Sequence, residues 1–176
     1  MKKGFTIVET LVAITVLMIA ISGPLTVSFR ALNAAVASRD QMIASFLAQD
    51  AMEYARNIKD NNITDQYSEG WLETIGECTK TVKCPVDTTR SAKIEPDCVN
   101  FTDSKCRLYK DSTGKYNHAA SSGSLTTPFY RTVYLQNIQS NTEEESAELV
   151  VDVLWTTGSY GLASTTFRTT IYNIAK

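Results

Sequence analysis

This sequence contains little histidine and has a small net charge, and each of these features argues against a class of function. The one histidine among the 176 residues is His118, so a histidine-dependent catalytic group could be built only around it. Glycine-rich nucleotide-binding motifs, the metalloprotease helix and the serine-hydrolase elbow are missing as well. The formal net charge of -2 gives no general attraction to nucleic acid. We therefore predict that the protein is not an enzyme and holds no cofactor, with calcium as the alternative discussed below, and that nucleic acid is a disfavoured partner.

Continuous hydrophobicity is confined to the start of the chain. Residues 5–29 contain a single ionisable side chain, Glu9, and a helix of that length spans a hydrocarbon core of about 30 Å. Lys2 and Lys3 precede this run, and the next basic residue is Arg30. By the positive-inside rule, the extreme N-terminus lies in the cytoplasm and the bulk of the chain lies outside. The sequence predicts a single-pass protein of the cytoplasmic membrane.

A secretory signal peptide and a plain single-pass anchor share this outline. A signal peptide has an apolar core of roughly 7 to 15 residues without a carboxylate, whereas the run here is longer and contains Glu9. The small residues Ala34, Ala35 and Ala37 could mimic a cleavage site, but they lie inside a pattern that continues as a helix. A plain anchor that carries an extracellular binding domain stays open as an alternative.

Glu9 is the most informative residue of the apolar run. An acidic side chain inside a membrane span costs roughly 2.5 to 3.5 kcal/mol at mid-helix and usually has a function. Arg30 is about 30 Å further along the same helix, too far to neutralise it. Cleavage between Gly4 and Phe5 would create an α-amino group at the right depth. In a bundle of staggered helices, Glu9 of one subunit could pair with that amine of a neighbour and fix the register.

Residues 2–14 read Lys-Lys-Gly-Phe-Thr-Ile-Val-Glu-Thr-Leu-Val-Ala-Ile. This stretch resembles the leader and first helical residues of type IV prepilins and type II secretion pseudopilins, with a start closer to the minor pilins. The resemblance implies that residues 1–4 are a prepilin leader. It also implies that a prepilin peptidase cuts after Gly4 and methylates Phe5, and that Glu9 serves assembly.

The same resemblance implies the partners and the destination of the chain. The precursor would sit in the cytoplasmic membrane and then enter an extracellular or periplasmic filament made of other pilin subunits. A pilin-like fold would place a β-sheet on the outer half of the long helix. The pair Gly23-Pro24 departs from the dense Leu-Ile run of many major pilins, and we expect it to kink or locally melt the helix.

Residues 30–62 predict an amphipathic helix that continues the apolar one. Its apolar stripe should pack on a sheet, and Asn61 and Asn62 are candidate stop residues. The apolar positions of the stripe are Leu32, Val36, Ile43, Phe46, Leu47, Ala51, Tyr54 and Ile58.

Residues 63–128 form a loop-rich connector in this interpretation. Trp71, Leu72 and Ile75 predict a short helical turn docked on the core, and the segment Asp111-Ser-Thr-Gly114 predicts a hairpin turn. Four cysteines lie in this connector and indicate disulfides in an oxidising compartment. They are Cys78, Cys84, Cys98 and Cys106, and three pairings are possible. Sequential pairing would close two small loops, each contributing about 2 to 3 kcal/mol.

Zinc and calcium are the two metals that residues of the connector could bind. Zinc is disfavoured, because neither cysteine pair has the spacing of structural zinc ligands and His118 lies well beyond the last cysteine. Calcium is a weaker possibility on Asp97, Asp103 and Asp111, because hard cations favour oxygen ligands. The spacing of these residues matches no calcium signature.

Residues 129–176 predict an antiparallel β-meander. The strand-like runs are Phe129 to Ile138, Glu148 to Thr156 and Thr165 to Ile174, and the connections between them are short. The fold class is therefore α+β, with a long N-terminal α-helix, half membrane-spanning and half amphipathic, packed on a small antiparallel sheet.

The function that these features favour is a structural subunit of a type IV pilus or related pseudopilus. A pilus-associated adhesin or DNA-binding minor pilin is the alternative, because Lys80, Lys83, Arg90 and Lys93 cluster in the connector. Acidic residues dilute that cluster, which favours an ordinary solvated surface.

Overall fold

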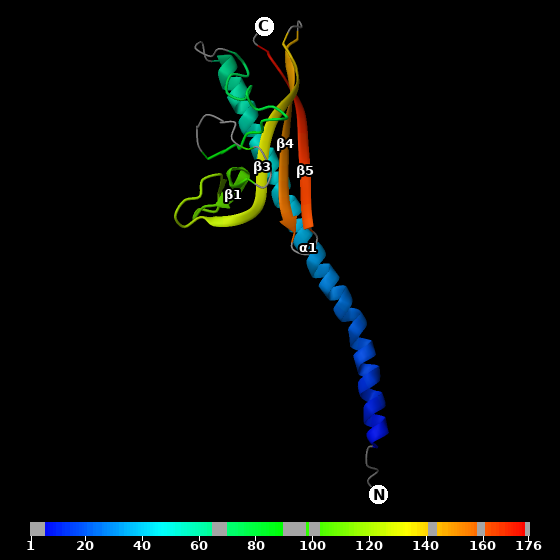
Figure 1. The fold of residues 1–176 in the computed structure, drawn as a ribbon. Helices are drawn as coiled ribbons and strands as arrows, with labels where there is room; N and C mark the ends of the chain where they lie inside the picture. The colour runs from blue at the N-terminus through cyan, green and yellow to red at the C-terminus, as the bar shows by residue number, and fades with distance from the viewer. Residues whose placement is uncertain are drawn as a thin grey trace. The chain divides into compact units, whose positions relative to one another are not determined.

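The computed structural model describes residues 6–64, 70–89, 98, 103–140, 144–157 and 161–174. The chain divides into two compact units, Met1–Arg39 and Asp40–Lys176. One long helix and one sheet contain most of the regular structure (Figure 1). In chain order the elements are α1 (Ile7–Thr64), the 3-10 helix η1 (Ser104–Cys106), β1 (Arg107–Lys110), β2 (Tyr116–Asn117), β3 (Leu125–Gln139), β4 (Ser146–Thr157) and β5 (Gly161–Tyr172).

The first unit contains the apolar part of α1. One stretch of this helix is long and apolar enough to cross a membrane by length and composition, and none of its side chains is buried. The helix runs through Pro24 without a break, so of the two effects predicted for Gly23-Pro24, local melting was wrong and a kink stays a prediction. Proline removes one backbone donor, and the hydrogen bonds of the turns on either side keep the helix intact.

The second unit is an antiparallel sheet with the outer part of α1 on one face. The strand order is β2-β1-β3-β4-β5, and β4 pairs along its length with β3 and β5. The prediction of a helix packed on an antiparallel meander is confirmed. Strand β3 begins at Leu125 and β5 at Gly161, both earlier than the sequence predicted.

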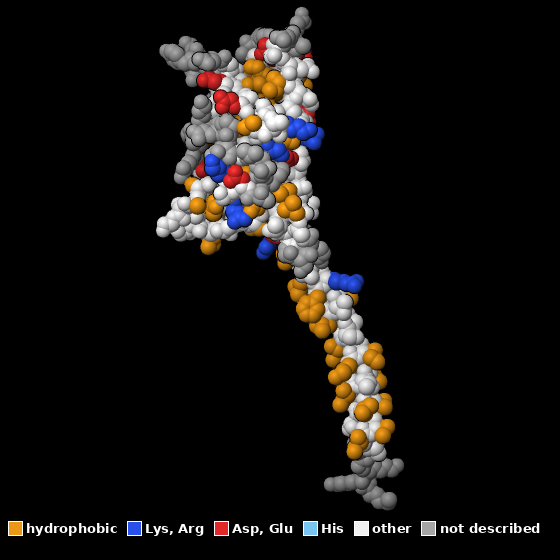
Figure 2. Space-filling model, viewed as in Figure 1, with side chains coloured by type: hydrophobic (Ala, Val, Ile, Leu, Met, Phe, Trp, Pro, Cys, Tyr) orange, Lys and Arg blue, Asp and Glu red, His pale blue; other side chains and the backbone are white. Residues whose placement is uncertain are grey.

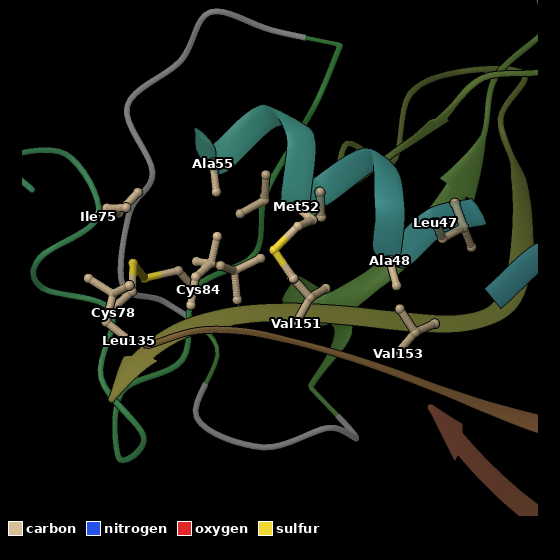
Figure 3. Packing of buried hydrophobic residues seen from close by; sticks show 14 of the residues in the cluster. Leu47, Ala48, Met52, Ala55, Ile75, Cys78, Cys84, Leu135, Val151 and Val153 are labelled. Atoms are coloured by element: carbon tan, nitrogen blue, oxygen red, sulfur yellow. A yellow bond between two sulfur atoms is a disulfide. The ribbon is translucent and has the colours of Figure 1, made fainter. Parts of the chain in front are cut away.

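Small side chains let α1 approach the sheet closely. Figure 3 shows Leu47, Ala48 and Met52 facing Val151 and Val153 of β4. The helix residues buried in this core are Ala44, Leu47, Ala48, Ala51, Met52 and Ala55. The predicted stripe was therefore partly wrong: Phe46 is 63% exposed, and Leu32 and Val36 are exposed as well. Alanines occupy the contact instead, because bulky side chains would hold the helix away from the strands.

The connector continues the sheet on the free side of β3. Cys84 and Val133 exchange two backbone hydrogen bonds of 3.0 and 2.9 Å, and Leu135 donates to the Cys78 carbonyl over 2.7 Å. Residues 78–84 thus follow the same edge of β3 that β1 pairs with nearer the start of the strand. The predicted turn before them is confirmed, because Gly76 donates to the Leu72 carbonyl and Ile75 is fully buried.

The predicted hairpin within the connector is also confirmed. Strands β1 and β2 pair antiparallel, and Asp111 donates its backbone N–H to the Lys115 carbonyl over 2.9 Å. Gly114 has a φ of 89°, a conformation that glycine adopts without strain.

Candidate assembly site

The start of α1 is capped by Thr6. The Glu9 backbone N–H donates to the Thr6 Oγ1 over 3.3 Å and to the Thr6 carbonyl over 3.1 Å. Thr6 is therefore the N-cap and Glu9 the third helical residue, as in a capping box of the Thr-x-x-Glu type. Thr6 was not among the predicted functional residues, although the spacing from Thr6 to Glu9 matches the sequence signature of a capping box.

Glu9 lies in the first turn of α1 and is exposed. A carboxylate at this position interacts favourably with the positive end of the helix dipole, by about 0.3 to 1 kcal/mol. Along α1 the next basic side chain after it is Arg30, about 30 Å away at the rise of an α-helix. The processing residues Gly4 and Phe5 lie outside the described residues.

The apolar side chains that follow Glu9 point in every direction around the helix. Figure 2 shows hydrophobic side chains along the visible face of this part of α1. Large apolar residues such as Met18, Ile19 and Val27 are each at least two-thirds exposed, and consecutive ones lie on different faces. A helix that is apolar on all sides needs a membrane or other protein around it. The site is therefore a cylinder of apolar surface with one charge near its start.

The hydroxyl groups of this cylinder are satisfied within the helix. Thr10 donates to the Ile7 carbonyl over 2.7 Å and Thr15 to the Val12 carbonyl over 2.8 Å. Ser22, Thr26 and Ser28 make the same kind of bond, at 2.9 Å each. A buried hydroxyl without a partner would cost on the order of 1 to 3 kcal/mol. Because each has one, the helix can enter hydrocarbon or a helix bundle without that cost.

The cysteines form two sequential disulfides, Cys78–Cys84 and Cys98–Cys106, and no described cysteine is free. The first bridge lies in the core beside Ile75 and Leu135 (Figure 3). Since both pairs are oxidised to disulfides, these sulfurs are not available as zinc ligands. Each bridge closes a small loop within the connector, and backbone hydrogen bonds of Cys78 and Cys84 hold the first loop against β3.

Two of the three acidic residues that were candidate calcium ligands make hydrogen bonds to nearby residues. Asp103 caps η1 by accepting the Lys105 backbone N–H over 3.1 Å. One carboxylate oxygen of Asp111 accepts hydrogen bonds from Thr113 and Lys115 in the hairpin turn, which hold the Asp111 pKa below its usual value. Asp97 lies outside the described residues. Within the described ranges, no group of three or more metal-ligating side chains comes together.

The basic cluster of the connector is partly occupied by internal contacts. Lys83 forms an ion pair with Asp152 at 2.9 Å, and its ammonium lies 4.8 Å from the centre of the Tyr134 ring. Arg90 and Lys93 lie outside the described residues. Lys83 therefore serves to hold the connector on the outer face of the sheet.

His118 is uncharged at neutral pH. Burial and the nearby positive charge of Arg131 lower its pKa to about 4, and its Nδ1 lies 3.1 Å from the Lys105 carbonyl oxygen. The Nε2 atom is buried and has no hydrogen-bond partner in the described part of the chain. This setting suits a packed side chain near the hairpin.

Comparison with known protein families gives one match. Residues 1–23 match the model of the prokaryotic N-terminal methylation motif, a stretch that includes Gly4, Phe5 and Glu9. No curated protein and no solved structure matches the chain.

Proposed function

We propose that this chain, which carries the N-terminal methylation motif of a type IV pilin-like protein, is a structural subunit of a type IV pilus or related pseudopilus. The observation that carries the proposal is the apolar cylinder. It overlaps the methylation motif at residues 1–23, and none of its side chains is covered within the chain. A secreted globular domain has no use for such a surface, whereas a subunit that leaves a membrane and enters a helix bundle requires it.

The proposed sequence of events begins in the cytoplasmic membrane. The precursor is inserted with its N-terminus inside, and a prepilin peptidase removes residues 1–4 and methylates Phe5. The mature subunit is then extracted into the filament, where the helices of neighbouring subunits replace lipid around α1. The disulfide-linked second unit stays outside. We also propose that the subunit is a minor one and that it works without a cofactor.

Glu9 sets the position of each subunit against its neighbour in this proposal. Its carboxylate pairs with the terminal amine of an adjacent copy, because a charge in an apolar bundle needs a counter-charge. The pairing is directional and occurs once per subunit, as with single buried polar groups that fix register in coiled coils.

Three variants separate this role from helix capping. Glutamine can replace glutamate in a capping box, so Glu9→Gln keeps the cap and loses only the charge, whereas Thr6→Ala loses the cap and keeps the charge. Thr10→Ala is the control, because it removes a neighbouring hydroxyl of the same helix turn. The full-length proteins are produced in cells that have a prepilin peptidase and the rest of a pilus machine.

The intact mass reports processing, and the sheared-filament fraction reports incorporation. We expect all variants to mature to Phe5 and only Glu9→Gln to stay out of filaments. Normal incorporation of Glu9→Gln would refute the pairing role. A wild-type chain that keeps Met1, or that never enters filaments, would refute the proposed function itself.

A further inference from the structure

Strand β5 forms a long open edge of the sheet (Figure 1). Among the described residues, β5 pairs only with β4, and it runs for 12 residues without a register shift. The opposite side of the sheet is protected, because β2 is 2 residues long and residues 78–84 follow β3 beside β1. Proline, lysine and bulges are usual devices that prevent edge strands from pairing with another chain, and β5 has none of them. The edge of β5 is therefore a candidate interaction surface.

Alternate residues of β5 direct their backbone groups to this edge. Asn173 donates its N–H to the Glu145 carbonyl over 2.9 Å, on the β4 side. Because the backbone groups of successive residues point to opposite sides of a strand, the odd-numbered residues of β5 bond to β4 and the even-numbered ones point to the open edge. The even-numbered side chains are all exposed, on the face of the sheet away from α1. They are Leu162, Ser164, Thr166, Arg168, Thr170 and Tyr172.

The sequence of β5 is nearly symmetric about Phe167. Residues at equal distances before and after Phe167 have the same chemistry, apart from the central pair Thr166 and Arg168. A strand of this kind is complementary to a copy of itself in antiparallel orientation, with the two Phe167 residues facing each other. The matching positions are Leu162 and Tyr172, Ala163 and Ile171, Ser164 and Thr170, and Thr165 and Thr169.

We infer that β5 pairs antiparallel with β5 of a second copy of the chain, centred on Phe167. Even-numbered residues then face even-numbered residues, so the backbone groups of the two open edges can exchange hydrogen bonds. Leu162 and Tyr172, which are 65% and 50% exposed in the single chain, cover one another at both ends of the contact. Ser164 faces Thr170, a hydroxyl pair of the kind that stabilises antiparallel strands. The second copy thus satisfies both the backbone and the exposed apolar residues of the edge.

Arg168 and Tyr172 select this register over the neighbouring ones. Moving the partner by one residue would place even-numbered residues opposite odd-numbered ones, whose backbone groups point the other way. Moving it by two residues in one direction sets Arg168 opposite itself, and like charges that face each other are destabilising. The same movement in the other direction leaves Tyr172 opposite a residue beyond the start of β5. In the inferred register Arg168 faces Thr166 and keeps its own counter-charge, because Glu148 lies 3.9 Å away on the same copy.

The antiparallel orientation determines which copies can meet. The outer part of α1 runs in opposite directions in two copies joined in this way, whereas copies inserted in one membrane or assembled in one filament all point the same way. Under the proposed function, on which this step rests, the contact joins subunits of two filaments that lie side by side in opposite directions.

A mixed disulfide tests the contact and its register. Full-length chains are held in detergent micelles, which leave two copies free to face in opposite directions. One chain carries Ser164→Cys and the other Thr170→Cys, and the native cysteines are already paired. Facing residues of antiparallel strands lie about 5.5 Å apart between Cα atoms, within the range for a disulfide. Two copies of the same variant place their new cysteines about 20 Å apart in this register and are the matched controls.

Oxidation of the mixture should give a dimer joined between positions 164 and 170, at least about tenfold more abundant than the dimer from either variant alone. Thr166→Pro in both chains should reduce its yield by at least about tenfold. The Thr166 N–H points to the open edge, so proline removes a donor to the second copy and none to β4. Thr166→Ala is the control, because it also removes the hydroxyl that donates to Asp152, and it should change the yield by less than about twofold.

Equal yields from the mixture and the single variants, or no dimer at all, would overturn the inference. A folded Thr166→Pro chain that cross-links as well as Thr166→Ala would overturn it too. Tryptophan fluorescence shows whether the proline variant is folded, and if it is not, the comparison of mixed with single variants decides alone. None of these results depends on maturation or filaments, so the proposed function stands or falls separately: a chain that is never processed or never enters filaments would refute that function and leave the pairing of β5 to the cross-link.

Discussion

Removing the half-exposed Asp50 should destabilise the second unit more than removing the fully buried Arg131. Arg131 is 0% exposed and joins three parts of the unit. Its Nη1 donates to Asp50 over 2.9 Å and to the Leu47 carbonyl over 3.1 Å, and its Nη2 donates to the Val86 carbonyl over 2.6 Å. The side chain therefore ties β3 to both α1 and the connector.

The loss of stability in Arg131→Met depends on which buried groups lose a hydrogen-bond partner when the guanidinium is removed. The Leu47 carbonyl still accepts the backbone N–H one helical turn later, and Asp50 can turn to water. Only the Val86 carbonyl loses its partner, which costs about 1 to 3 kcal/mol. Burial lowers the pKa of Arg131, so its charged form is disfavoured by desolvation, and methionine removes that penalty. We expect a net loss of about 1 kcal/mol.

The cost of Asp50→Ala is larger because it removes the ion-pair partner of the buried guanidinium, which then keeps only its weaker electrostatic interaction with Asp87. Breaking a buried ion pair in this way costs about 3 to 5 kcal/mol, and the partial exposure of Asp50 places it near the lower end, at about 3 kcal/mol. The double variant should be close to Arg131→Met alone, since no uncompensated charge remains. The control is Arg168→Met on β5, whose ion pair with Glu148 is long, at 3.9 Å, and exposed. It should change stability by less than about 0.5 kcal/mol.

Urea unfolding of the full-length protein in detergent micelles measures these differences. Both tryptophans, Trp71 and Trp155, belong to the second unit and contact its core, so their fluorescence reports its unfolding. A loss for Arg131→Met that equals or exceeds the loss for Asp50→Ala would refute the reasoning. It would mean that the hydrogen bonds of the guanidinium outweigh its charge.

Three further predictions concern the same unit and use the same unfolding assay. The folded pKa of His118 is about 4, below its usual 6.5, so stability should be full above pH 6.5 and fall by about 3 kcal/mol as pH drops towards 4. His118→Gln should remove most of that fall, and an unchanged pH profile would contradict it. Cys78→Ala with Cys84→Ala should cost at least about 2 kcal/mol from the lost loop constraint, and a smaller loss would count against the bridge. Gly114→Ala should cost about 1 kcal/mol because of its positive φ, whereas a neutral result would show that the turn can rearrange.

The N-terminal half of α1 could be predicted from the sequence because its signal is local. An uninterrupted apolar run, one carboxylate and the flanking lysines fix its length and direction without any tertiary contact. Local melting at Gly23-Pro24 does not occur, because the loss of one backbone donor at proline need not interrupt the neighbouring turns. The role of Thr6 as the N-cap of α1 was missed, although Thr6 and Glu9 have the spacing of a capping box.

The helix face that meets the sheet was harder to predict because size, not hydrophobicity, decides it. Phe46 is more hydrophobic than Ala44 and Ala48 and was therefore expected in the core. The alanines are buried instead, and Phe46 is exposed. The repeat of alanines at spacings of three and four was a usable signal of close approach. The partners of Arg131 were beyond such reasoning, because they come from α1 and from the connector, far away along the chain.

The identity of residue 9 as glutamate and not glutamine supports a counter-charge outside the chain's own helix. A capping box works with either residue, so capping alone does not explain an acid at this place. The helix dipole supplies about 0.3 to 1 kcal/mol, whereas an acid within a membrane span costs up to roughly 2.5 to 3.5 kcal/mol. The difference must come from another group, and along α1 the next cation, Arg30, lies too far away to provide it. A terminal amine at Phe5 of a neighbouring copy, created by the cleavage that the methylation motif predicts, is the group that we infer closes this gap.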